Sequence, residues 1–159
     1  MWYFTLKFVH VVGAAVLLGT GAGIAFFMLM AHLGGRPIVI AGVARIVVIA
    51  DFVFTASAVV VQPITGILLA RLLGYSLWEG WIVWSIVLYF VTGAFWLPVV
   101  WMQMRMRDLA AAAVKEELPL PAVYHRLFWL WFAFGFPAFG AVLAIFWLMI
   151  AKPALAIWP

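Results

Sequence analysis

Four apolar segments, each long enough to cross a membrane, account for most of this chain of 159 residues. A helix needs about 20 apolar residues to span roughly 30 Å of hydrocarbon. The segments extend over residues 4–32, 43–73, 77–106 and 124–151. They are too long, and alternate too little, to be strands of a membrane barrel. The sequence therefore predicts one all-α transmembrane domain over residues 1–159, an integral membrane four-helix up-down bundle.

Composition places most of the protein surface in lipid. Of the residues, 70% are hydrophobic and 9% are charged, whereas a soluble domain is nearer half apolar and about a quarter charged. A chain of this length cannot hide so much apolar surface in one core, so we expect contact with a lipid bilayer. The chain has no cysteine, which excludes disulfides, thiolate metal sites and Fe–S clusters. No basic run is interleaved with aromatic residues, and we expect no nucleic-acid partner.

Cations near the segment ends predict the orientation. Six of them flank the first and third connections, and three flank the termini and the second connection. This excess predicts cytoplasmic first and third loops, with both termini outside, in a bacterial inner (cytoplasmic) membrane. The six are Arg36, Arg45, Arg105, Arg107, Lys115 and Arg126, and the three are Lys7, Arg71 and Lys152. Aromatic residues near the same ends predict interfacial anchors, namely Trp2, Tyr3, Tyr75, Trp78, Trp81, Tyr124 and Trp158.

Three histidines fall within or beside the apolar segments, where ionisable side chains are costly and often functional. His10 and His32 are 22 residues apart, or about 33 Å along a helix, so they cannot share one haem or metal ion. His32 and His125 belong to the predicted inner ends, where they could form a bis-histidine haem site beside Arg126. His10 would lie on the outer side, with Met149 as a second iron ligand. The alternative for His10 is a hydrogen bond to a neighbouring helix.

Small residues follow His10 on the same helical face, beginning with Gly13 and Ala14. Such residues leave room for a flat ligand such as a porphyrin. They also let two helices pack closely, and Gly19-x-x-x-Gly23 is a pattern of that kind. Prolines interrupt three of the segments, and each removes a backbone hydrogen bond and frees a carbonyl group. These prolines are Pro63, Pro98 and Pro137.

A polar stripe runs along the second segment. Its members recur at positions i, i+4, i+7, i+11 and i+14 of an α-helix, namely Asp51, Thr55, Ala58, Gln62 and Thr65. A carboxylate in hydrocarbon must be neutralised or paired, and we expect the partners of Asp51 among Arg45, Arg126, His32 and His125. The stripe could be a hydrogen-bonded seam between helices or part of a proton route.

Several short motifs, taken together, resemble a bacterial family of predicted four-helix integral membrane proteins of unknown function. They are LKFVH at the start, QPITGILLA in the second segment, GWI at the start of the third, and Lys152-Pro153 at the end. The resemblance covers nearly the whole chain and implies the same four-helix fold.

A more distant resemblance is to the HemJ type of protoporphyrinogen oxidase, a small four-helix membrane protein associated with haem b. The chain is similar to that family in a Lys-x-x-His motif at Lys7 and His10, a Thr/Gly pattern at Gly66 and a Lys-Pro end at Lys152, and His32 falls near the family's second histidine. The resemblance implies that these residues belong to a haem site. The chain has Phe-Phe-Met-Leu-Met where that family has Leu-Pro-Arg, and it lacks the family's Asn-Glu motif. We therefore expect haem binding by a related scaffold instead of the same reaction.

These features lead us to expect a haem b-binding membrane protein of electron transfer or haem-linked oxidation. His10 would be the axial ligand of the haem iron, and Lys7 and Lys152 would pair with the haem propionates. We expect quinone or a respiratory complex as the redox partner, and either a homo-oligomer or a place in a larger complex. Two alternatives stay open. One is a cofactor-free accessory subunit of a membrane complex, and the other is a small transporter or proton channel built on Asp51.

Overall fold

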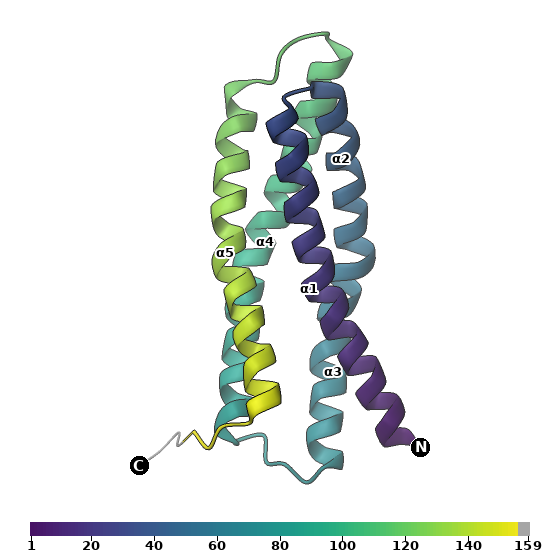
Figure 1. The fold of residues 1–159 in the computed structure, drawn as a ribbon, viewed down its shortest axis with the longest axis vertical. Helices are drawn as coiled ribbons and strands as arrows, with labels where there is room; N and C mark the ends of the chain where they lie inside the picture. Colours follow the sequence, from purple (N-terminus) through teal and green to yellow (C-terminus); the bar gives the residue numbers. More distant parts are fainter. Residues whose placement is uncertain (156–159) are drawn as a thin grey trace.

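Three elements in line form the second rod of the bundle, and three single helices form the others (Figure 1). The computed structural model describes residues 1–155, so the predicted anchor Trp158 lies outside the described residues. The elements are α1 (Trp2–Gly34), α2 (Pro37–Ala50), the π-helix η1 (Asp51–Thr55), α3 (Ala56–Leu72), α4 (Gly80–Lys115) and α5 (Ala122–Ala151). Residues 1–155 contain no strand, and the all-α prediction is confirmed.

Four rods of the described chain are long and apolar enough to cross a membrane. They are α1, the continuous rod α2–η1–α3, α4 and α5, and an 18-residue window in each has a mean hydropathy of 1.9 to 2.3. Large apolar side chains face outward along all four rods, among them Phe8, Ile46, Phe90 and Trp147. An outer surface of this kind fits lipid and not water.

A glycine and a proline make the connection between the first two rods short. Gly35 has a φ of 65°, the left-handed conformation that glycine adopts without strain, and its N–H donates to the carbonyl oxygen of His32. Pro37 occupies the first turn of α2, where its missing N–H is not needed. Helix α2 therefore begins at Pro37, whereas the second apolar segment was predicted to begin near Val43.

Helix α4 continues through the alanine run to Lys115, as the high helix propensity of alanine predicts. Pro119 and Pro121 then lie in the connection to α5, and Pro121 has an extended backbone directly before the first residue of α5. The rods are thus longer than the hydrocarbon they cross, and their ends project beyond it.

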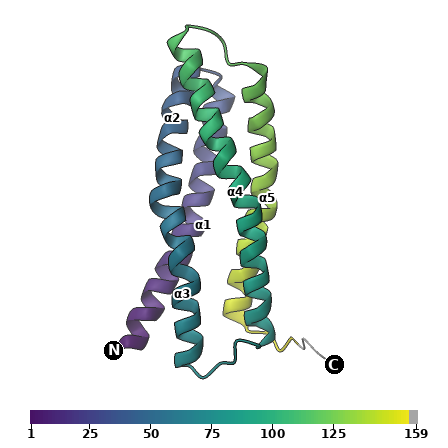
Figure 2. The same cartoon turned by 180° about the vertical axis from the view of Figure 1, so that it is seen from behind.

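The rods are arranged as two pairs (Figures 1 and 2). Helix α1 lies along α2–η1–α3, α4 lies along α5, and the contact of α2 with α4 joins the pairs. Helix α1 begins and α5 ends at one end of the bundle, which we call the terminal end, and the α1–α2 and α4–α5 connections lie at the far end (Figure 1). Towards the terminal end α1 leans away from the other helices (Figure 1).

Most of the apolar core is shared by α1, α2, α4 and α5. It consists of Ile24, Met28, Ala31, Ile40, Ala44, Val47, Met102, Met106, Ala110, Tyr124, Phe128 and Trp131. A smaller apolar cluster lies towards the terminal end and consists of Ala70, Trp81, Ile82 and Leu148. Trp81 is 8% exposed, so the prediction that it anchors the bundle at the membrane interface is wrong. The same prediction is wrong for Tyr124, which is 0% exposed. It shares the inward face of α5 with Phe128 and Trp131, at helical spacing.

Pro63 has a consequence that ties two rods together. Proline cannot donate a hydrogen bond to the carbonyl group four residues earlier, which here belongs to Val59. The hydroxyl group of Tyr89, from α4, donates to that carbonyl oxygen over 2.9 Å. An acceptor that the proline leaves free is thus satisfied by a side chain from another helix.

Candidate functional site

The first polar network joins α1 to α3. Nδ1 of His10 lies 2.8 Å from Oγ1 of Thr65, and Nε2 of Gln62 donates to the carbonyl oxygen of His10 over 2.8 Å. Thr65 is buried, and His10 and Gln62 are half-buried. Gln62 and Thr65 of the predicted stripe therefore contact His10, the predicted iron ligand. The bond from Nδ1 of His10 to Thr65 is also the hydrogen bond to a neighbouring helix that was the alternative prediction for His10.

The hydrogen bonds of Thr65 determine which nitrogen of His10 carries the proton. A hydroxyl group has one proton to donate, and Oγ1 of Thr65 directs it to the carbonyl oxygens of Val61 and Gln62, at 2.8 and 3.2 Å. With the hydroxyl proton directed to these carbonyl oxygens, the same oxygen accepts from Nδ1–H of His10. In the neutral ring the lone pair consequently lies on Nε2, the nitrogen that can take a metal ion or a proton.

Two glycines allow α1 and α3 to approach each other at this network. A Cβ atom added at Gly13 would collide with Nε2 of Gln62, and one added at Gly66 would lie 3.3 Å from Cε1 of His10. A Cβ atom added at Gly19 would meet no other atom within 4 Å. The close approach of helices therefore occurs at Gly13 and Gly66, and not at Gly19, where the small-residue pattern placed it.

The two lysines predicted to accompany His10 have aromatic neighbours. Nζ of Lys7 lies 5.6 Å from the ring centroid of Tyr3. Nζ of Lys152 donates to the hydroxyl oxygen of Tyr75 over 3.3 Å and lies 4.9 Å from the centroid of that ring. Both lysines are exposed, and they belong to the first turns of α1 and to the residue that follows α5, which share the terminal end.

The second polar network surrounds Asp51, which is 4% exposed. Nε1 of Trp96 donates to Oδ1 over 3.3 Å. With the amide nitrogen of Gln103 facing the carboxyl group, Nε2 donates to Oδ2 over 3.1 Å, and Oε1 accepts from Nε1 of Trp131 over 3.3 Å. The network thus links η1 to α4 and α5, and the prediction of a cationic or histidine partner for Asp51 is wrong. Both donors are neutral, so an ionised carboxylate here would have no counter-ion in the described part of the chain.

The predicted stripe divides between these two networks. Asp51 faces α4 and α5, whereas Gln62 and Thr65 face α1. The π-helix η1 explains the division, because a π turn holds about one residue more than an α turn. The extra residue rotates the following side chains by about 100° relative to a regular helix. Thr55 and Ala58, which lie between, are buried, and the hydroxyl group of Thr55 has no hydrogen-bond partner among the described residues.

The third group is an aromatic cluster around His32 at the far end. The ring of His32 stacks on that of Phe128, with centroids 3.6 Å apart and planes 6° apart. The rings of Tyr124, Trp129 and His125 lie 5.8, 5.8 and 5.6 Å from it. Nδ1 of His32 is buried without a hydrogen-bond partner in the described chain. The sequence prediction that His32 and His125 lie close together agrees with this arrangement.

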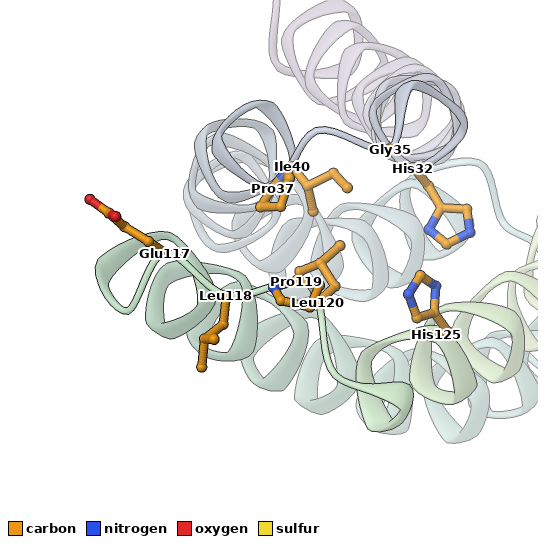
Figure 3. Close-up of a pocket in the computed structure, with 9 residues that line it drawn as sticks. All are labelled: His32, Gly35, Pro37, Ile40, Glu117, Leu118, Pro119, Leu120 and His125. Carbon is orange, nitrogen blue, oxygen red and sulfur yellow. The ribbon is translucent and has the colours of Figure 1, made fainter.

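A cavity of about 430 Å³ opens beside the two histidines, between the α1–α2 and α4–α5 connections (Figure 3). His32 and His125 project into it from α1 and α5, and Glu117 points away from both (Figure 3). Among the described residues no three side chains of the types that ligate metals come together. Arg126 follows His125 on α5 and is exposed.

The histidines of the two predicted haem sites have different surroundings. His10 supplies a neutral imidazole whose Nδ1–H is held by Thr65, with the small residue Gly66 beside the ring, and this suits one axial position. Met149 packs beside the smaller apolar cluster. That cluster includes Ala70 of α3, which lies one helical turn after Gly66. His32 and His125 both line the cavity of about 430 Å³, with ring centroids 5.6 Å apart, and the ring of His32 also stacks on that of Phe128.

Sequence reasoning missed four residues that make polar contacts between helices. Gln103 is an isolated polar residue in an apolar run, and Tyr89 lies mid-span, away from the membrane interface. Both positions could have been singled out as polar groups that need a partner in lipid. Trp96 and Trp131 carry no such signal, since the chain has 10 tryptophans and most tryptophans in membrane proteins are explained by anchoring or packing.

The chain matches the family model described as predicted integral membrane protein (DUF2269) over residues 4–153. This match covers nearly the whole chain, and the chain belongs to that family. No curated protein and no solved structure matches it.

Proposed function

We propose that this integral membrane protein binds haem b near the terminal end of the bundle, with His10 as an axial ligand. Its role would be electron transfer or a haem-linked oxidation, with quinone or a respiratory complex as the redox partner. The observation that carries the proposal is the hydrogen bond of 2.8 Å between Nδ1 of His10 and Oγ1 of Thr65.

This bond supports ligation because it supplies what a metal-bound histidine needs. Such a histidine almost always donates its second N–H to a protein acceptor, which fixes the tautomer and the ring orientation. Thr65 is that acceptor here, since its own proton is directed to backbone carbonyl oxygens.

Two lysines are the candidate partners of the haem propionates. Lys7 and Lys152 lie at the terminal end, where they would hold the propionates by charge-assisted hydrogen bonds. Their present cation–π contacts are worth about 0.5–1 kcal/mol at exposed sites, whereas hydrogen bonds to charged groups are worth about 1.5–3 kcal/mol. Carboxylates of a ligand would therefore displace the aromatic rings as partners.

The test is an absorption spectrum of the full chain, purified in detergent from cells with an adequate haem supply. We expect a Soret band, sharp α and β bands after dithionite reduction, and haem b in a pyridine haemochrome assay. His10→Ala should lose the haem while it retains helical content and a single gel-filtration peak, and His125→Ala should keep it. A featureless spectrum of the wild type would refute haem binding, and a His10→Ala protein with full haem content would refute the assignment of the ligand.

A second candidate function is proton transfer through Asp51. One observation favours it: a buried carboxyl group without a counter-ion lies at the start of a π-helix, and π-helical turns are frequent at functional sites. A carboxyl group that has only neutral partners can change its proton occupancy without breaking an ion pair. The His10 network and the Asp51 network lie on the same rod, so both roles can belong to one protein.

Proteoliposomes with a pH-sensitive dye inside test this candidate. Asp51→Asn should abolish proton flux without a change in the absorption spectrum, and Asp108→Asn, which neutralises an exposed carboxylate of α4, should leave the flux unchanged. Wild-type protein that conducts no more protons than empty liposomes would exclude the channel reading.

A further inference from the structure

A groove between α2 and α4 carries two arginines and a floor of small residues. It encloses about 370 Å³, and its lining includes Ala41, Gly42 and Arg45 from α2 and Arg107, Asp108 and Ala111 from α4. It lies apart from the two polar networks and from the His32 cavity, with which it shares no lining residue. Its volume is within the range of about 300–1,000 Å³ that ligand pockets occupy.

The position of Arg45 along its rod places this groove at the level of lipid headgroups. The rod α2–η1–α3 has 36 residues and is about 54 Å long, at 1.5 Å a residue. The hydrocarbon layer is about 30 Å thick, so a centred rod projects about 12 Å on each side. Arg45 lies eight residues after Pro37, which is about 12 Å from the start of the rod. Its Cα atom is therefore at the boundary between hydrocarbon and headgroups.

Arg45 has no protein partner among the described residues. It is exposed, and no hydrogen bond or salt bridge joins it to another described side chain. Arg107 differs, because its Nε and one terminal nitrogen both lie 2.8 Å from Oδ1 of Asp108. A guanidinium group at this depth can extend to the headgroup layer, where phosphate oxygens are available as partners.

The charges of the groove indicate which anion it suits. Two guanidinium groups and one carboxylate leave one net positive charge. Guanidinium groups bind phosphate oxygens in pairs, and Arg107 keeps N–H groups that Asp108 does not use. A lipid whose phosphodiester is its only charge carries the matching single negative charge, whereas a zwitterionic lipid brings an ammonium group as well.

We propose that the groove between α2 and α4 binds the headgroup of an anionic phospholipid, with its phosphodiester held by Arg45 and Arg107. Basic pockets between membrane helices bind such headgroups in this way. The acyl chains would lie against the exposed apolar surface next to the groove, which includes Ile38 and Ile46. This inference does not depend on haem binding, since it concerns different residues.

Gly42 allows the groove to be filled without a change in charge. A Cβ atom added at this position would meet no other atom within 4 Å, so a larger side chain can be accommodated by the fold. Gly42→Leu would occupy the space above the floor of the groove. It therefore separates the need for space from the need for charge.

Native mass spectrometry of the delipidated full chain tests the proposal, with phosphatidylglycerol and phosphatidylcholine of identical acyl chains as probes. We expect tighter binding of phosphatidylglycerol, and a loss of about tenfold for Arg45→Gln and for Arg107→Gln, as expected for the removal of one charge-assisted hydrogen bond. Gly42→Leu should weaken binding as well. Arg105→Gln is the matched control, because it removes the same charge from α4 two residues away, outside the groove.

Three results would overturn the proposal. The first is equal binding of the two lipids by the wild type. The second is unchanged phosphatidylglycerol binding by Arg45→Gln in a protein whose helical content and thermal stability are retained. The third is competition by millimolar inorganic phosphate that matches phosphatidylglycerol, since the groove would then recognise a free anion and not a lipid.

Discussion

The hydroxyl group of Tyr89 donates a hydrogen bond of 2.9 Å to the carbonyl oxygen of Val59, the acceptor that Pro63 leaves without its usual backbone donor. A proline in one rod thus creates the binding point for a tyrosine of another. Polar contacts of this kind fix which faces of membrane helices meet, because lipid offers apolar surfaces no preference among partners.

Tyr89→Phe should destabilise the bundle by about 1 kcal/mol, within the range measured for hydrogen bonds between membrane helices. The loss should shrink towards zero in a Pro63→Ala background, because the N–H group restored at position 63 can itself satisfy Val59. Denaturant unfolding of all four proteins in detergent gives the coupling. Equal losses in both backgrounds would show that the tyrosine does not serve the proline-freed carbonyl group.

Thr65→Val should lower haem affinity by about 10- to 100-fold, the usual effect of removing the hydrogen-bond partner of a metal-bound histidine. The substitution keeps the size of the side chain and removes the acceptor for Nδ1–H of His10. Titration of haem into the stripped protein measures the effect. Thr92→Val is the control, since the Thr92 hydroxyl also donates to the carbonyl group four residues earlier but bonds no histidine. Equal haem affinities of the two variants would contradict the orienting role.

Gly13→Ala should destabilise the contact of α1 with α3 by about 0.5–1.5 kcal/mol, because the displaced amide group of Gln62 loses its hydrogen bond to the carbonyl oxygen of His10. The added methyl group would collide with the amide of Gln62. Gly19→Ala should be neutral or stabilising, because its Cβ atom has open space and alanine is the better helix former. Thermal unfolding of the two variants checks the prediction. A larger loss at Gly19 would place the helix contact where the small-residue pattern had predicted it.

Gln103→Leu should destabilise the fold by about 1–3 kcal/mol, since it removes the hydrogen-bond partner of Oδ2 of Asp51 and that of the indole N–H of Trp131. Met102→Leu is the control at the neighbouring buried position, where an apolar swap of similar volume usually costs less than about 1.5 kcal/mol. Denaturant unfolding compares the two. The prediction fails if both variants lose the same small amount.

Much of the fold could be predicted from the sequence because the length of an apolar run is a local property. The four spans, and the extension of the third through the alanine run, follow from neighbouring residues alone. The start of the second span was misplaced, because Pro37 and the residues after it were not recognised as the first turn of α2.

The partners within the candidate site could not be predicted in the same way. His10 meets Thr65 across 55 positions, and Asp51 meets Trp96 across 45, so the pairs depend on how whole helices pack. The π-helix explains why Asp51 faces different helices from Gln62 and Thr65. Periodicity arguments assume a uniform turn, and one inserted residue changes the face on which every later side chain lies.

Because of that inserted residue, the second rod presents polar side chains on two different faces. Asp51, on one face, contacts α4 and α5, and Gln62 and Thr65, on the other face, contact α1. Because one continuous helical rod carries both sets of side chains, any rotation of that rod about its axis would change the contacts of both polar networks together.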